Sequence, residues 1–307
     1  RDSAWLETAV TVVEFYSEHD SVFHTLLKMP PSFGDLYKPV KDLLNKKYNG
    51  DSHKVDIKAV DGVTFNPVFT RKGDKVDGTV SVEGTYDPCA WASMKLKYTI
   101  ATAGNLTTKM TVSKMAPGLV VEGNWDAAMG DDVSKDKYDA KATYTVDSGN
   151  CELKVVKGKA QTAEISGVYG VLKDFNLGAS MSYSLTGVQE SVGVSGAYIL
   201  SKQTTAAFML NRKGSKDTLT AGFIQKGSPY TIAAQYETAL SDPKSGSITV
   251  GCERKLEGGQ TVKAKATSGG AIALSLQHAL SKEFNLCASL DVTGGKSKFG
   301  TELVYSA

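Results

Sequence analysis

Long hydrophobic runs are missing from this chain of 307 residues. No stretch approaches the roughly 18 apolar residues that a membrane-spanning helix needs, so the sequence argues against a helical membrane protein. This absence does not exclude a membrane barrel, because a membrane-spanning strand carries apolar residues in alternation with polar ones. The formal net charge of +2 is too small to indicate a nucleic acid partner.

Metal ligands and catalytic groups are also scarce. The four cysteines lie far apart and form no Cys-x-x-Cys pair, which argues against a zinc or redox site. Beyond residue 28 the only histidines are His53 and His278, too few for a histidine metal cluster or a hydrolase triad. Residues 294–297 resemble the end of a phosphate-binding loop, but Leu290 stands where that motif requires glycine. We therefore expect no enzyme activity and no cofactor.

Residues 1–28 differ from the rest of the chain. They contain two basic and five acidic residues, whereas a mitochondrial transit peptide is rich in arginine and poor in acids. The first methionine is Met29. We interpret residues 1–28 as a non-native upstream extension, residues 29–51 as an amphipathic helix and hinge, and residues 52–307 as a β domain.

From residue 54 onward, apolar and polar side chains alternate in short runs. Phe284, Leu286 and Ala288, for example, alternate with Asn285 and Cys287. A period of two is typical of strands with one apolar face. Glycine pairs and Asp-Pro dipeptides separate the runs, as turns do. Counting the runs predicts about 19 strands of about 8–11 residues, which is the length that a tilted strand needs to cross a bilayer.

A soluble β sandwich shows the same alternation, so a soluble all-β binding protein stays open as an alternative. The strands follow one another through short turns without a domain linker, which suits an up-and-down barrel. Only Pro67, one of eight prolines, falls inside a strand pattern, in keeping with the exclusion of proline from ladder interiors. The predicted fold is an all-β transmembrane barrel of about 19 strands with an N-terminal helix in the pore.

That helix is predicted within residues 32–47. The apolar positions Leu36, Val40, Leu43 and Leu44 share one helical face with Phe33. Because proline lacks a backbone donor, the proline at position 39 should break or kink the helix. The charged residues expected to line the pore are Asp35, Lys38, Lys41, Asp42 and Lys46.

Residues 30–36 read Pro-Pro-Ser-Phe-Gly-Asp-Leu and are followed by Lys38, Lys41-Asp42 and Lys46-Lys47-Tyr48. This motif resembles the N-terminus of the eukaryotic porins, the mitochondrial voltage-dependent anion channels. The continuation over residues 48–54 is similar to plant-type members, and further matches lie at 116–119, 262–265, 294–296 and 303–305. The resemblance covers residues 29–307. A mitochondrial member of the family has 19 strands, so our strand count is not independent of the resemblance.

The resemblance implies a voltage-gated, weakly anion-selective channel for ions and metabolites such as ADP, ATP and phosphate. Its location would be the mitochondrial outer membrane, and its partners would be the lipid bilayer, anionic metabolites and, as a possible assembly, further copies of itself. A protein-import translocase barrel is the alternative of the same architecture, and a plastid envelope also stays open.

Two of the positions that depart from the family pattern bear on function. Val120 stands where many members have lysine, so a nucleotide contact of that lysine is not carried over. Tyr98 stands about where animal members carry a lipid-facing glutamate, so regulation through that acid is not expected.

Seven lysines lie on the polar faces of predicted strands. A charge that faces the bilayer midplane costs about 2–4 kcal/mol, so we expect these side chains to face the lumen and to attract anions. They are Lys95, Lys97, Lys109, Lys141, Lys154, Lys263 and Lys265.

The last predicted strand fits the pattern of a mitochondrial barrel insertion signal, polar-x-Gly-x-x-hydrophobic-x-hydrophobic. The matching residues are Lys298, Gly300, Leu303 and Tyr305. A last strand must pair through its edge while barrel closure is incomplete, and an exposed edge is a template for such pairing. We expect Gly300 to permit a close backbone approach, and Leu303 and Tyr305 to face lipid.

Overall fold

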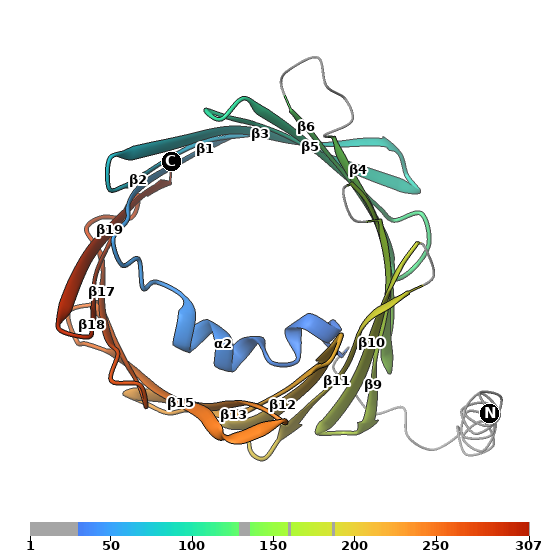
Figure 1. The fold of residues 1–307 in the computed structure, drawn as a ribbon. Coiled ribbons are helices and arrows are strands. Elements are labelled where there is room, and N and C mark those ends of the chain that lie inside the picture. Colours follow the sequence, from blue (N-terminus) through green and yellow to red (C-terminus); the bar gives the residue numbers. More distant parts are fainter. Residues whose placement is uncertain (1–29, 129–135, 159–160, 186–187, 307) are drawn as a thin grey trace, which may run out of the picture.

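The computed structural model describes residues 30–128, 136–158, 161–185 and 188–306. These residues form one sheet of 19 strands that closes on itself (Figure 1). Neighbours in chain order pair antiparallel, and the first and last strands close the barrel as a parallel pair. An up-and-down sheet with an odd number of strands can close in no other way. The predicted all-β barrel is confirmed, whereas the interpretation of residues 1–28 lies outside the described residues.

Two short helical pieces precede the barrel in place of one continuous helix. They are the 3₁₀ helix η1 (Phe33–Asp35) and the helix α2 (Lys38–Asn45). Pro39 lies in the first turn of α2, where its missing N–H would have no partner in any case. The break that the proline predicts therefore falls just before it, and the rest of the helix is regular.

The strands have the following bounds: β1 (His53–Asp61), β2 (Val63–Lys72), β3 (Lys75–Cys89), β4 (Ala92–Ala101), β5 (Asn105–Ser113), β6 (Leu119–Ala128), β7 (Lys137–Val146), β8 (Gly149–Lys157), β9 (Thr162–Leu172), β10 (Phe175–Ser184), β11 (Gln189–Ile199), β12 (Thr204–Lys213), β13 (Lys216–Lys226), β14 (Tyr230–Ala239), β15 (Asp242–Lys255), β16 (Thr261–Thr267), β17 (Ile272–Ala279), β18 (Phe284–Thr293) and β19 (Lys296–Ser306). Tight turns join most of them, and glycines with positive φ, such as Gly73 and Gly214, sit in those turns.

The two faces of the barrel wall differ in polarity. On β4, Lys95 and Lys97 face the lumen, whereas Tyr98 and Ile100 on the other face are 47% and 49% exposed. The same alternation continues around the barrel and leaves a broad apolar belt on the outside. Such a belt is what bilayer lipid covers. Among the described residues, no helix is long and apolar enough to cross a membrane.

Candidate functional site

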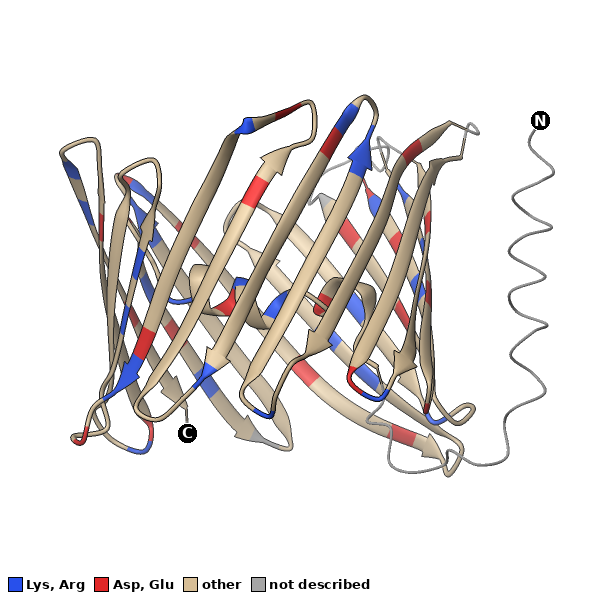
Figure 2. Ribbon diagram, turned by 90° about the horizontal axis from the view of Figure 1, so that it is seen from below, with Lys and Arg blue, Asp and Glu red and all other residues tan. Residues whose placement is uncertain are grey.

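The helix α2 lies inside the lumen, against the inner face of β13, β14 and β15 (Figure 1). In the side view it crosses the lumen between the two rims of the barrel (Figure 2). Its buried side chains are Val40, Leu43 and Leu44, and Leu36 between η1 and α2 is buried with them; each is at most 5% exposed. The apolar face that the sequence predicts is therefore the face that contacts the wall.

The wall beneath η1 and α2 is built from uncharged and mostly small residues, which we call the covered wall. Its members are Val168, Gly178, Gly193, Gly222, Ile224, Ala233 and Gly251. A Cβ added at Gly251 would lie 2.7 Å from a methyl group of Leu44 and 3.2 Å from one of Leu43. A Cβ at Gly222 would lie 3.2 Å from Val40. Glycine lets the helix approach the sheet this closely because it has no side chain.

Two aromatic residues extend this contact. Phe33 of η1 lies over β10 and β11, where a Cβ at Gly178 or Gly193 would come within 3.0 Å of its ring. Tyr37 is 5% exposed, and its hydroxyl has no hydrogen-bond partner among the described residues. Burial raises the pKa of the Tyr37 phenol. Tyr37 is not part of the apolar face that is predicted from the sequence.

The five charged helix residues predicted to line the pore lie on the side away from the wall. Lys38 pairs with Asp35 at 3.0 Å and Lys46 pairs with Asp42 at 2.7 Å. The hydrogen bond from Lys38 lowers the pKa of the Asp35 carboxyl, and one from the Ser32 hydroxyl contributes. Lys41 is exposed and has no ion pair within the described part of the chain. Their role in the pore stays a prediction.

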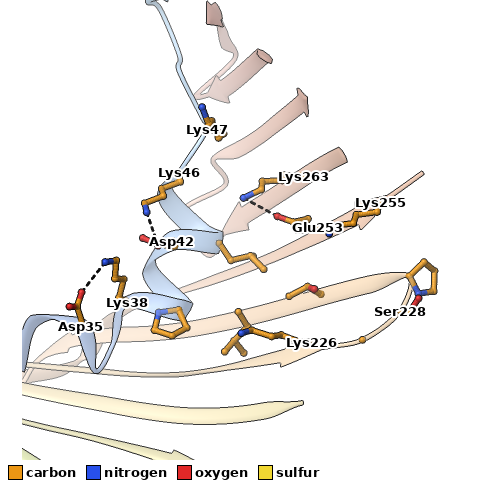
Figure 3. A pocket seen from close by; sticks show the side chains of 16 residues that line it. Asp35, Lys38, Asp42, Lys46, Lys47, Lys226, Ser228, Glu253, Lys255 and Lys263 are labelled. Carbon is orange, nitrogen blue, oxygen red and sulfur yellow. Dashed lines mark hydrogen bonds and ion pairs between the residues drawn. The ribbon is translucent and has the colours of Figure 1, made fainter. Parts of the chain in front are cut away.

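A cavity of about 800 Å³ lies between α2 and the strands β13 to β16 (Figure 3). Lys263 lies in it only 8% exposed, and its ammonium is 3.0 Å from Glu253. Cations outnumber acids around the cavity, so it can hold an anion electrostatically. The cations are Lys38, Lys46, Lys47, Lys226, Lys255 and Lys263, and the acids are Asp35, Asp42 and Glu253.

The opposite part of the lumen carries charges with no helix over them. We call it the charged wall, and its members are Glu83, Lys95, Lys97, Lys109, Glu122, Lys141, Glu152 and Lys154. The Glu122 carboxylate forms ion pairs with the ammonium groups of Lys109, at 2.7 Å, and Lys141, at 3.2 Å. Lys141 also lies 3.2 Å from Glu152. The lysines are predicted from the sequence, whereas these glutamates are not, and they offset much of the positive charge.

The remaining predicted lysines have different surroundings. Lys95 pairs with Glu83 at 2.6 Å, and Lys265 lies 4.5 Å from the ring centre of Tyr48. Lys97 and Lys154 have no ion pair among the residues that the structure describes. All seven lysines lie on the lumenal face, but whether they determine selectivity stays a prediction.

The four residues of the predicted insertion signal lie on both faces of β19. Lys298 is 3.5 Å from Asp51 in the lumen, and Gly300 lies under the backbone carbonyl of Asn49. Leu303 and Tyr305 are on the lipid-facing side, where the Tyr305 ring packs against Phe284 at 4.7 Å. A role in membrane insertion stays a prediction.

Known proteins are similar to this chain in sequence. The family model described as eukaryotic porin matches residues 29–300. Mitochondrial outer membrane protein porin 3 of Arabidopsis thaliana is 27% identical over 254 residues, which is 82% of this chain and 88% of that protein. Mitochondrial outer membrane protein porin of 34 kDa from Solanum tuberosum is 26% identical, over 82% and 87% of the two chains. A mutant of the Rh. blastica porin aligns with a TM-score of 0.49 at 12% identity, over 78% of this chain and 90% of that one.

Proposed function

Because this chain belongs to the eukaryotic porin family, we propose that its lumen is a voltage-gated, weakly anion-selective route for ions and for metabolites such as ADP, ATP and phosphate. The chain is a pore-forming channel and not an enzyme. The predicted location in the mitochondrial outer membrane is confirmed by relatives that carry this location in their names.

The excess of lysine around the cavity beside α2 is the observation that carries the proposal. Six lysines and three acids line it, so an anion that passes the helix meets a net positive field. In salt of physiological strength this field extends about 8 Å, which limits the preference for anions in a wide lumen. A large metabolite with several negative charges passes closer to the lysines than a small ion does, so it feels the field more strongly.

The position of the helix supports voltage gating. The helix bears lysines on one face and packs on the wall with the other. Moving one elementary charge across the full potential changes the energy by about 2.3 kcal/mol for each 100 mV. Moving several helix charges through the membrane potential therefore supplies several kcal/mol, which can be used to move the helix away from the wall.

Reconstitution of the chain into a planar bilayer tests the proposal. We expect one large conductance that decreases as the voltage rises in either direction, and a reversal potential in a salt gradient that favours anions. Deleting residues 29–48 should widen the pore and weaken voltage closure while the barrel persists. A conductance with neither voltage dependence nor anion preference would overturn the proposal.

The same recording separates the two alternative functions. A protein-import translocase predicts that an added precursor peptide blocks the pore at concentrations that leave metabolite passage of a porin unaffected. If the chain is a soluble all-β binding protein, no conductance should appear. The apolar belt on the outside of the barrel already argues against a soluble protein.

A further inference from the structure

The segment that joins α2 to β1 is bonded to the barrel wall along most of its length. We call residues 47–52 the linker. Its hydrogen-bond and ion-pair partners on the wall are on β18 and β19, and β19 pairs with β1 where the barrel closes (Figure 1). From the sequence, residues 29–51 are predicted to form a helix and a hinge, and nothing in the sequence points to these partners.

Glu302 is the centre of the contact. Its side chain is 8% exposed. The carboxylate forms ion pairs with the ammonium groups of Lys47 in the linker, at 2.8 Å, and of Lys54 on β1, at 3.1 Å. The side-chain amide of Asn49 lies 3.4 Å from the same carboxylate. Lys54 also pairs with Asp56 at 2.8 Å. A carboxylate this buried needs such partners, and removing one partner of a buried pair leaves an uncompensated charge.

Backbone groups of the linker are held as well. The Asn49 N–H donates to the Ser289 hydroxyl at 2.9 Å, and the Thr301 N–H donates to the carbonyl of Ser52 at 2.9 Å. The Asn49 carbonyl lies directly over Gly300, where any Cβ would collide with it. Gly300 therefore serves the linker, in addition to any part it plays in insertion.

The backbone conformation of the linker also indicates a fixed segment. Lys47 has φ 70° and Asp51 has φ 64°. These values lie in the left-handed region, which costs a residue with a Cβ about 1 kcal/mol or more. The side chains of both residues also form ion pairs with the wall, Lys47 with Glu302 and Asp51 with Lys298.

We infer that Glu302 is a positioning residue that latches the pore helix to the wall through Lys47. The Lys47–Glu302–Lys54 cluster, which we call the helix latch, fixes the C-terminal end of α2. While the Lys47–Glu302 pair is formed, the helix cannot rotate away from the barrel wall about the linker. Movement of the helix starts with the breaking of the Lys47–Glu302 pair. This inference holds whatever ions the pore prefers.

Electron paramagnetic resonance on the full chain in lipid nanodiscs tests the latch. The four cysteines are changed to serine, and spin labels are attached at Lys41→Cys on the exposed helix face and at Lys282→Cys in an exposed turn of the barrel. We expect one narrow distance distribution in the parent. Lys47→Met and Glu302→Gln should each broaden it, and the two together should broaden it no further because both break the same pair. Lys46→Met is the matched control, since Lys46 pairs with Asp42 inside the helix.

Circular dichroism and heat stability of the barrel are measured on the same samples. A residue with a merely structural role would lower the heat stability without releasing the helix. Lys47 lies outside the barrel strands, so its variant tests the latch even if Glu302→Gln fails to assemble. A narrow, unshifted distribution in Lys47→Met would overturn the inference, as would equal broadening in Lys46→Met. Failure of the proposed function would appear instead in the conductance of the unmodified chain.

Discussion

The covered wall and the charged wall are built on the same strand geometry and differ in the residues that face the lumen. Under α2 the lumenal positions hold residues such as Gly222, Ala233 and Gly251. Across the lumen the equivalent positions hold Lys109 and Glu122 and their neighbours. The alternation of apolar and polar residues allows both walls to form part of the barrel. The residues on the lumenal face decide whether a wall is covered by the helix or by water.

Desolvation explains why the helix rests where it does. The apolar face of α2 has to be buried, and burying it against lysines and glutamates would remove those charges from water at a cost of several kcal/mol for each ion, as an order of magnitude. Against small uncharged residues the same burial has no such cost. The charge distribution of the wall therefore specifies the position of the helix.

The largest expected effect comes from placing a charge in the contact between α2 and the covered wall. Val40 is 1% exposed and packs on Gly222. Val40→Asp buries a carboxylate without a partner, at a cost on the order of several kcal/mol, so we expect the helix to leave the wall. Single-channel conductance should then rise toward that of the chain lacking residues 29–48.

Lys41→Asp is the matched control for this prediction. It introduces the same side chain at the next position, but on the exposed face of α2. Its helix should stay in place and its conductance should remain close to that of the parent. Equal conductance changes in Val40→Asp and Lys41→Asp would show that burial against the covered wall does not hold the helix.

A smaller effect is expected on the charged wall, where net charge and not the number of lysines should set selectivity. Lys97→Gln with Lys154→Gln removes two positive charges that have no ion pair among the described residues. Lys109→Gln with Glu122→Gln removes one charge of each sign from a 2.7 Å pair. We expect the reversal potential to shift toward less anion preference in the first double variant and to stay unchanged in the second. Equal shifts in both would contradict this account.

The sequence predicts the features that depend on neighbours along the chain. Strand alternation and the helix face of Val40, Leu43 and Leu44 follow from periods of 2 and 3.6 residues. Tyr37 could have been included, because it lies four residues after Phe33 and three before Val40. Its hydroxyl made it look like a polar position.

Features that depend on barrel closure could not be predicted in this way. Glu302 meets Lys47 and Lys54 only because β19 pairs with β1 across the closure. Gly300 looks like part of a terminal strand motif until the Asn49 carbonyl is placed over it. Each of these contacts joins residues more than 240 positions apart in the chain, and no local pattern encodes such a partner.

The smallest expected effect concerns the pH dependence of helix docking on the covered wall. Burial raises the pKa of the Tyr37 phenol above its ordinary value of 10, and the nearby Glu237 contributes. The undocked phenol ionises as pH rises through about 10, while the docked phenol stays protonated, so docking is at full strength below pH 10 and weakens above it.

Tyr37→Phe should leave docking nearly unchanged at neutral pH, because the hydroxyl has no hydrogen-bond partner within the described residues. Above pH 10 the variant should keep the helix on the wall longer than the parent does, seen as a smaller rise in conductance. Lysines deprotonate in the same range, so parent and variant are compared at each pH, where that contribution is common to both. Identical pH profiles for the two chains would show that ionisation of Tyr37 is not linked to docking.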